Sequence, residues 1–147
     1  MITISDINAV AKKYATVYEA WMKPVCRKAG IPHTALCIFM FVANNPDKNT
    51  AQQVCEERGY KRAIVSMHIE SLVQKGLLKR TTVEGDRRKC ALEPTEKAQP
   101  VIAEARQLLA QFSEAVTLGF SKEDLKKIQE CFDIFRNNLD SMGNKVF

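Results

Sequence analysis

Basic side chains are concentrated in one segment of this 147-residue chain, where they could bind an anionic polymer. The chain carries 22 Lys and Arg against 17 Asp and Glu, a formal net charge of +5. Between Tyr60 and Cys90 the basic residues outnumber the acidic ones by five, so the rest of the chain is neutral. The basic residues of this segment are Lys61, Arg62, Lys75, Lys79, Arg80, Arg87, Arg88 and Lys89. Such a cluster favours a nucleic-acid partner over a role in solubility alone.

The five cysteines form neither a disulfide framework nor a zinc motif. Their number is odd, they lie far apart, and no Cys-x-x-Cys occurs, which favours a reducing cytoplasm. We expect most of them to be buried as small apolar side chains. Cys26 is the candidate redox-active thiol, because basic residues beside it would lower its pKa. His33 and His68 have no partner at ligand spacing, so no metal site is expected.

Patterns typical of an enzyme do not occur in the sequence. We find no Gly-rich phosphate loop, no paired catalytic carboxylates and no nucleophile beside a base, and we expect neither catalysis nor a cofactor. The composition, 46% hydrophobic and 27% charged, is that of an ordinary globular protein. The longest apolar stretch, 35–43, is well short of the roughly 20 residues of a membrane span. Residues 1–6 lack the pattern of a signal peptide, so we expect no membrane partner.

The elements that would position the basic segment follow from apolar spacing. Alternating steps of three and four between Ile7 and Trp21 predict an amphipathic helix that starts at Ser5 and is bent or ended by Pro24. A nearly all-apolar run predicts a buried second helix over 33–44. Thr50 and Gly59 are the expected cap and end of a short helix over 51–58.

The basic segment itself predicts a helix followed by a hairpin. A fourth helix is expected over 61–75, ended by Gly76, and short strands over 77–84 and 88–93 flank a turn that contains Gly85. A short helix, a tight turn, a second helix and a basic hairpin form a winged helix-turn-helix, whose second helix enters the major groove of DNA. The predicted buried stripe of that helix comprises Val65, Ile69 and Leu72.

Two long helices are predicted after the hairpin. The first opens at Thr95, has Pro100 in its first turns and ends at Gly119, and the second begins at Ser121. Amphipathic helices at both ends of the chain need an apolar partner, which favours a homodimer over packing within one chain. The apolar stripe of the last helix comprises Leu125, Ile128, Phe132, Phe135, Leu139 and Met142.

The predicted fold class is therefore mainly α with a small β-hairpin wing (α+β). Residues 1–147 form one domain with two lobes. A winged helix-turn-helix lobe spans 33–94, and a helical dimerisation lobe spans 5–30 and 95–142.

The order of three sequence blocks is typical of one protein family. The blocks are Leu72–Arg80, Asp86–Arg88 and Leu92–Ala98. With the helices around them, they resemble the MarR family of winged-helix transcription regulators over about residues 5–142. The family pattern is a Leu-x-x-x-Gly-Leu-x-x-Arg run, an Asp-x-Arg wing tip and a Leu-Thr-x-x-Gly-like entry into the fifth helix. The third block departs from this pattern, with Pro94 before the Thr and Ala98 in place of Gly.

The resemblance implies a homodimer built from the first helix and the last two. Its recognition helices and wings would bind half-sites of a pseudo-palindromic double-stranded DNA, about one helical turn apart. Asp86 matches the wing residue that holds the wing arginine, here Arg88, in the minor groove. Ser66 matches a phosphate or base contact. The predicted DNA-binding residues are Lys61, Arg62, Ala63, Ser66, Met67, Lys79, Arg87, Arg88 and Lys89.

The predicted recognition helix departs from the family in its outward residues. Met67 stands where Arg is more common, and Lys61 or Ala63 where Ser is common. An apolar face can contact thymine methyl groups but offers few bidentate hydrogen bonds to bases. This favours phosphate contacts and DNA shape as the basis of recognition.

Many family members respond to small aromatic or phenolic molecules bound between the dimer helices and the winged lobe. We therefore expect a repressor, or occasionally an activator, that such a ligand releases from DNA. One alternative replaces the ligand with oxidation at Cys26, and another is a winged-helix module that binds protein through an exposed apolar patch and never binds DNA. The residues expected near an effector cleft are Trp21, Met22, His33, Cys37 and Met40.

Overall fold

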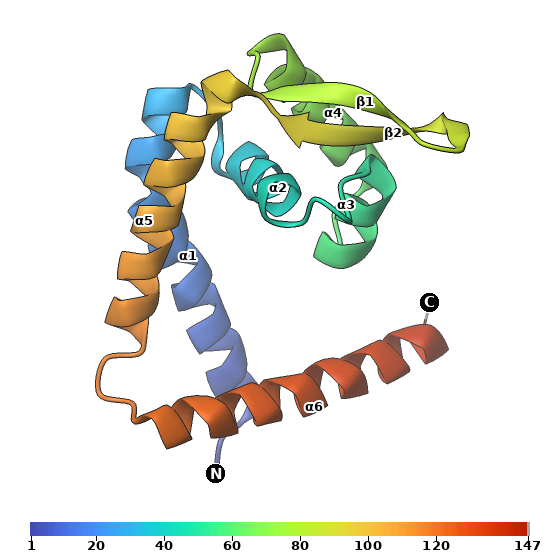
Figure 1. The fold of residues 1–147 in the computed structure, drawn as a ribbon. Helices are drawn as coiled ribbons and strands as arrows, with labels where there is room; N and C mark the ends of the chain where they lie inside the picture. The colour runs from blue at the N-terminus through green and yellow to red at the C-terminus, as the bar shows by residue number, and fades with distance from the viewer. Residues whose placement is uncertain (147) are drawn as a thin grey trace. The chain divides into compact units, whose positions relative to one another are not determined.

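The computed structural model describes residues 1–146, with side chains described through Gly143. Its elements confirm the predicted class, mainly helical with one antiparallel hairpin (Figure 1). They are, in order, α1 (Ile4–Ala29), α2 (His33–Asn44), α3 (Ala51–Arg58), α4 (Arg62–Gln74), β1 (Leu78–Val83), β2 (Asp86–Pro94), a 3₁₀ turn η1 (Glu96–Ala98), α5 (Gln99–Val116) and α6 (Lys122–Val146).

The chain divides into two compact units, and the boundary lies within α5. Met1–Ala110 holds α1 to α4, the hairpin and the first part of α5. Gln111–Phe147 holds the end of α5 and α6. The predicted division into a winged lobe and a dimerisation lobe concerns function and stays a prediction.

Helix α2 lies at the centre of the first unit. It packs against α1, α3, α4 and β2, and Phe39 on α2 is fully buried. The predicted stripe of α4, formed by Val65, Ile69 and Leu72, is buried in the same cluster, which confirms that prediction. One apolar helix thus fixes the positions of the elements around it.

The start and the end of α1 differ from the prediction. Its cap is Thr3 rather than Ser5: the Thr3 hydroxyl accepts a hydrogen bond from Asp6 N at 3.1 Å, and the Asp6 carboxylate accepts one from Thr3 N at 2.9 Å. Of the two effects predicted for Pro24, a bend or an end of the helix, the second is wrong, since α1 continues to Ala29. Pro24 lies on an exposed face, where water can satisfy the carbonyl that loses its partner.

The hairpin forms as predicted but around a shorter turn. Val83 pairs with Asp86, which leaves Glu84 and Gly85 as a two-residue turn, with Gly85 at φ 82°. Such turns match the twist of the strands and require a positive φ that glycine adopts without strain. Arg87, which we expected in the turn, therefore lies in β2. The turn forms the tip of the wing (Figure 1).

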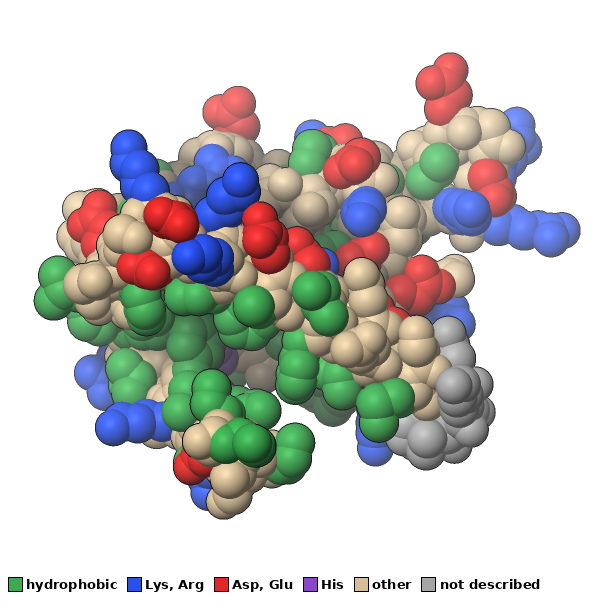
Figure 2. All heavy atoms as spheres, turned by 90° about the horizontal axis from the view of Figure 1, so that it is seen from below, with side chains coloured by type: hydrophobic (Ala, Val, Ile, Leu, Met, Phe, Trp, Pro, Cys, Tyr) green, Lys and Arg blue, Asp and Glu red, His purple; other side chains and the backbone are tan. Residues whose placement is uncertain are grey.

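Helix α6 begins at the predicted cap and exposes five of the six residues of its predicted apolar stripe, whereas Ile128 is half-buried. Ser121 Oγ accepts a hydrogen bond from Asp124 N at 3.1 Å, and Asp124 accepts one from Ser121 N at 2.9 Å. Phe132 on this helix is 63% exposed, as is Ile134. Figure 2 shows hydrophobic side chains in a row along the helix that leads to the C-terminus. This surface is far more apolar than an amphipathic helix exposes when its apolar face is covered.

Candidate nucleic-acid interface

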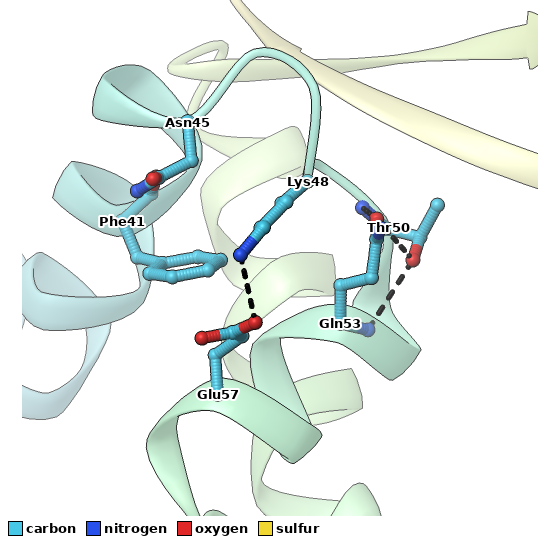
Figure 3. Close-up of polar contacts among 6 residues, drawn as sticks. All are labelled: Phe41, Asn45, Lys48, Thr50, Gln53 and Glu57. Atoms are coloured by element: carbon cyan, nitrogen blue, oxygen red, sulfur yellow. Dashed lines mark hydrogen bonds and ion pairs between the residues drawn. The ribbon is translucent and has the colours of Figure 1, made fainter.

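The turn between α2 and α3 fixes where the helix-turn-helix begins (Figure 3). The Asn45 side chain donates a hydrogen bond at 2.8 Å to a backbone carbonyl in the last turn of α2. Lys48 pairs with Glu57 of α3 at 3.0 Å. Thr50 and Gln53 form a capping box, each side chain accepting from the other's backbone N–H at 3.2 Å, which confirms the predicted cap. These contacts set the orientation of α3 with respect to α2.

Helix α4 presents the predicted face to solvent. Because Val65, Ile69 and Leu72 are buried against α2 and its neighbours, the opposite side of the helix is exposed. Lys61 precedes the helix as its cap residue, and Arg62 is its first residue. The exposed residues on and beside the outward face are Arg62, Ala63, Ile64, Ser66, Met67 and Glu70.

An ion pair that the sequence did not reveal ties α4 to the hairpin. Arg80 of β1 donates to the Glu70 carboxylate at 2.8 Å, and Gln74 donates to it at 3.4 Å. The hydrogen bond and the charge of Arg80 lower the pKa of Glu70 from its ordinary value. The one acidic side chain on the outward face is therefore held by Arg80, among the described residues.

The base of the wing carries a second compensated charge. Lys79 and Glu93 are partners in the strand register, and their side chains approach to 3.5 Å. Both side chains are about half exposed, so water screens the pair and its contribution to stability is small. Lys79, which we predicted to contact DNA, thus shares its charge with a neighbouring carboxylate.

The tip of the wing carries the uncompensated charge. Arg87, Arg88 and Lys89 are exposed and make no ion pair with any described residue. Asp86 accepts a hydrogen bond from the backbone N–H of Arg88 at 2.9 Å. The structure thus brings together the two residues that the resemblance pairs, and Asp86 holds the Arg88 backbone. The Arg88 guanidinium is left free of a protein partner within the described chain.

A cleft of about 590 Å³ connects the wing with the helix-turn-helix. Arg62 of α4, Arg88 and Lys89 of β2, and Gln52 and Gln53 of α3 all line it. The two glutamines were missed in the sequence, although Gln53 is the third residue after the Thr50 cap and could have been found as a capping-box partner. The basic side chains of the recognition helix and of the wing therefore meet at one concave surface.

The residues expected near an effector cleft do not form one set. The prediction for Met22 and Met40 is wrong, because both side chains are buried in the apolar core. Trp21 is 37% exposed, and its Nε1 donates to Leu108 O at 3.0 Å. His33 Nε2 lies 3.5 Å from Cys37 Sγ, and both residues are half-buried.

His33 also lines a cleft of about 650 Å³ between α1 and the start of α2. Lys23 and Arg27 of α1 face the same cleft. The His33 Nδ1 atom is buried and has no hydrogen-bond partner among the described residues. An unpaired buried nitrogen is costly unless water or a ligand satisfies it.

The structure reverses the prediction for the cysteines. Cys26 is buried, and this burial raises the pKa of its thiol, whereas a redox-active cysteine needs an exposed thiol with a lowered pKa. Cys37 and Cys55 are half-buried. Cys90 and Cys131 are exposed, so the expectation that most cysteines are buried is wrong. Cys26 therefore lacks the exposure and the lowered pKa that the oxidation hypothesis requires.

Two further findings concern metal and membrane. The described residues include no group of three or more His, Cys, Asp or Glu side chains placed to hold a metal ion. Within residues 1–146 no single helix is long and apolar enough to cross a membrane, and α1 and α2 meet the criteria only as a pair bent by 84°.

Part of the chain matches the sequence model of a known family. Residues 29–89, from the end of α1 to the wing, match the sequence model of the MarR family. Solved structures of the same fold cover nearly the whole chain. A MarR protein from Peptoclostridium difficile is 14% identical, with a TM-score of 0.82 over 100% of this chain and 97% of that one.

Two more solved structures show the same similarity. A regulator assigned to the MarR family in Listeria monocytogenes, crystallised with a 26mer DNA, is 14% identical, with a TM-score of 0.79 over 95% of this chain and 89% of that one. The transcription regulator MarR from Oenococcus oeni is 17% identical, with a TM-score of 0.74 over 90% of this chain and 99% of that one. At these identities the three structures establish the fold of this chain. The resemblance is therefore confirmed: residues 29–89 match the MarR family, and the chain has the fold of its transcriptional regulators.

Proposed function

We propose that this chain is a homodimeric, sequence-specific regulator of transcription that binds double-stranded DNA through α4 and the wing. The observation that carries the proposal is the group of three exposed basic residues, Arg87, Arg88 and Lys89, that no described carboxylate pairs, beside the exposed face of α4. The Listeria relative crystallised with DNA supports the same use of the fold. A DNA-binding role also favours the cytoplasmic location expected from the cysteines.

In this proposal, α4, the wing and the flanking basic residues contact different parts of the DNA. The first half of α4 enters the major groove, where Ala63, Ser66 and Met67 meet base edges. Arg88 reaches the minor groove, whose negative potential attracts arginine. The remaining predicted contacts, Lys61, Arg62, Lys79, Arg87 and Lys89, neutralise phosphates and set the register.

Exposed apolar surface on two helices supports the homodimer. A monomer rarely leaves large contiguous apolar patches in water. A two-fold dimer through the predicted dimerisation lobe, 5–30 and 95–142, would cover them and place two wings on half-sites about ten base pairs apart. The exposed apolar residues are Ile4, Val10 and Val17 of α1 and Leu125, Phe132, Ile134, Phe135, Leu139 and Met142 of α6. Sedimentation equilibrium tests this directly: a dimer mass is expected, and a monomer at micromolar concentration would contradict it.

The cleft beside His33 supports regulation by a small ligand. An aromatic or phenolic molecule there would place polar atoms near the unpaired His33 Nδ1 and near Lys23 and Arg27. We propose that such a ligand releases a repressor from DNA. A panel of phenols and aromatic carboxylates tests this: at about 100 times its Kd a ligand stabilises the protein by about 2.7 kcal/mol and so raises Tm. If no member changes Tm or releases DNA, this part of the proposal is wrong.

The DNA-binding proposal is tested by titrating a fluorescent duplex at 50 and 200 mM salt. The five residues of each protomer that are assigned to phosphates give about ten phosphate contacts per dimer, which corresponds to a loss of about 10⁵-fold in affinity over that range. Binding that is independent of salt would contradict the electrostatic basis of the proposal.

A second function is favoured by one observation. Ile64 and Met67 are exposed on α4, and an exposed apolar patch is the feature expected of a winged-helix module that binds protein. The same titration separates the two functions, because that module would bind no duplex and would tolerate removal of its basic residues.

A further inference from the structure

The outward face of α4 is apolar where it would meet the bases. Met67 is 56% exposed and Ile64 is 39% exposed, and Ala63 lies one turn before Met67 on the same face. The N-terminal part of a recognition helix is the part that contacts base edges. Exposing a methionine and an isoleucine to water is unfavourable, so this face gains most from an apolar partner.

The polar groups of the same face offer little direct base recognition. Strong discrimination between bases comes from Arg or Lys on guanine and from Asn or Gln on adenine. No such side chain occupies the outward positions of the first two turns after Arg62 in the described structure. The Glu70 carboxylate, which could accept from cytosine, is already held by Arg80 at 2.8 Å.

The surroundings indicate which apolar partner fits. Lys61 and Arg62 are exposed and directly precede Ala63, so cationic groups border the apolar face at the start of the helix. Arg62 also lines a cleft with Arg88 and Lys89 of the wing, to which Asp47 and Glu56 contribute carboxylates. A duplex satisfies both features, since its phosphates match the basic border and the thymine C5-methyl is the apolar group that bases present in the major groove. A purely apolar protein segment would leave the cationic border unmatched.

We infer that α4 recognises the C5-methyl groups of thymine in the major groove, with Met67 and Ala63 packed against them. The inference rests on the DNA-binding function proposed above and assigns it a specificity. Met67 is the specificity-determining residue, and Ser66 beside it is left to contact a phosphate or a base edge. In the dimer the same contact occurs once in each half-site.

The experiment uses the full chain and duplexes selected from random 30-base-pair inserts. Each thymine of the selected site is replaced in turn by uracil, which removes only the methyl group. Loss of one buried methyl-sized group corresponds to about a four-fold loss of affinity, and loss of the symmetric pair to about 15-fold. Where cytosine replaces a contacted thymine, 5-methylcytosine should bind about four-fold more tightly than cytosine.

Matched variants assign the effect to Met67. M67A should bind thymine and uracil duplexes with nearly equal affinity, whereas M67L should keep the preference. Met67 is exposed, so both variants should fold as the natural chain does. R88A should lower affinity for both duplexes and leave the thymine-to-uracil ratio unchanged, because the minor groove does not contain the methyl group.

Three results would overturn the inference, and they differ in what else they overturn. If a specific site is selected but every uracil duplex binds as tightly as its thymine counterpart, methyl recognition is wrong and the DNA-binding function stands. If M67A keeps the full thymine preference, another residue reads the methyl groups. If no duplex is bound at all, the proposed function itself fails.

Discussion

Replacing Arg88 with alanine is the most informative change in the wing. Its side chain is exposed, makes no ion pair with a described residue, and extends from a backbone that Asp86 holds at 2.9 Å. The substitution should therefore leave Tm unchanged and act on DNA binding alone. This separation makes the size of the binding effect interpretable.

The expected loss of DNA affinity in R88A follows from the two copies of Arg88 in a dimer. A hydrogen bond to a charged group contributes about 1.5 kcal/mol at the lower end of its range, or about 12-fold in affinity. Two copies in a dimer give about 150-fold. The Arg88 charge in the minor groove lies between the flanking phosphates and counts as about one neutralised phosphate, which is about 0.9 in the slope of log K against log salt. R88A should therefore reduce that slope by about 1.8 per dimer.

The assay is fluorescence anisotropy of a selected duplex, measured over a series of salt concentrations. K12A, which removes the same charge from an exposed position on α1, is the matched control and should leave the slope unchanged. K79A should give an intermediate result, a slope lower by about one, because Glu93 already shares the charge of Lys79 at 3.5 Å. An R88A slope equal to that of the natural chain would refute the reasoning, since the wing would then make no contact with DNA.

Three further predictions concern the fold and the assembly. Arg80 lowers the pKa of Glu70, so the stability that this pair adds is complete above the ordinary carboxyl range and is lost as pH falls through the lowered pKa. E70Q lacks the carboxylate, so its Tm should fall less than that of the natural chain between about pH 6 and about pH 3. An equal fall in Tm would contradict this. F135D places a charge in the exposed stripe of α6 and should shift the protein toward a monomer in sedimentation equilibrium, whereas an unchanged dimer would exclude this stripe from the interface. T50A removes the capping box of α3 and should lower the free energy of unfolding in urea by about 1 kcal/mol; no change would show that the cap adds no stability.

Local patterns predicted the elements because the signals for them are local. The α2 range and the cap of α3 agree with the sequence, since apolar periodicity and a Thr-x-x-Gln cap need no information from distant residues. The outward face of α4 followed from the same periodicity once Val65, Ile69 and Leu72 were placed inward.

Contacts between elements could not be predicted in this way. The Glu70–Arg80 pair depends on how the hairpin docks on α4, and the Lys79–Glu93 pair depends on a strand register that shifts between Thr82 and Val83. The prediction for Cys26 is wrong because burial depends on the face of α1 on which the thiol lies, and basic neighbours in the sequence do not reveal that face. Its spacing from Met22, Val25 and Ala29 marks a second apolar stripe of α1, which faces the core.

The lining of the effector cleft also depends on contacts between elements and could not be predicted from the sequence. Met22 and Met40 are apolar residues near the right elements, but only the packed core decides which of them a cleft exposes. His33 does line a cleft, because it is the first residue of α2 and lies close to the end of α1.

The central claim is that two copies of α4 and the wing recognise one DNA site. Selection of bound duplexes from random DNA tests it most directly. We predict an enriched pseudo-palindrome whose half-sites lie about ten base pairs apart, with thymines at matching positions in both halves. Recovery of no enriched sequence, or of a single half-site without its inverted copy, would contradict the account.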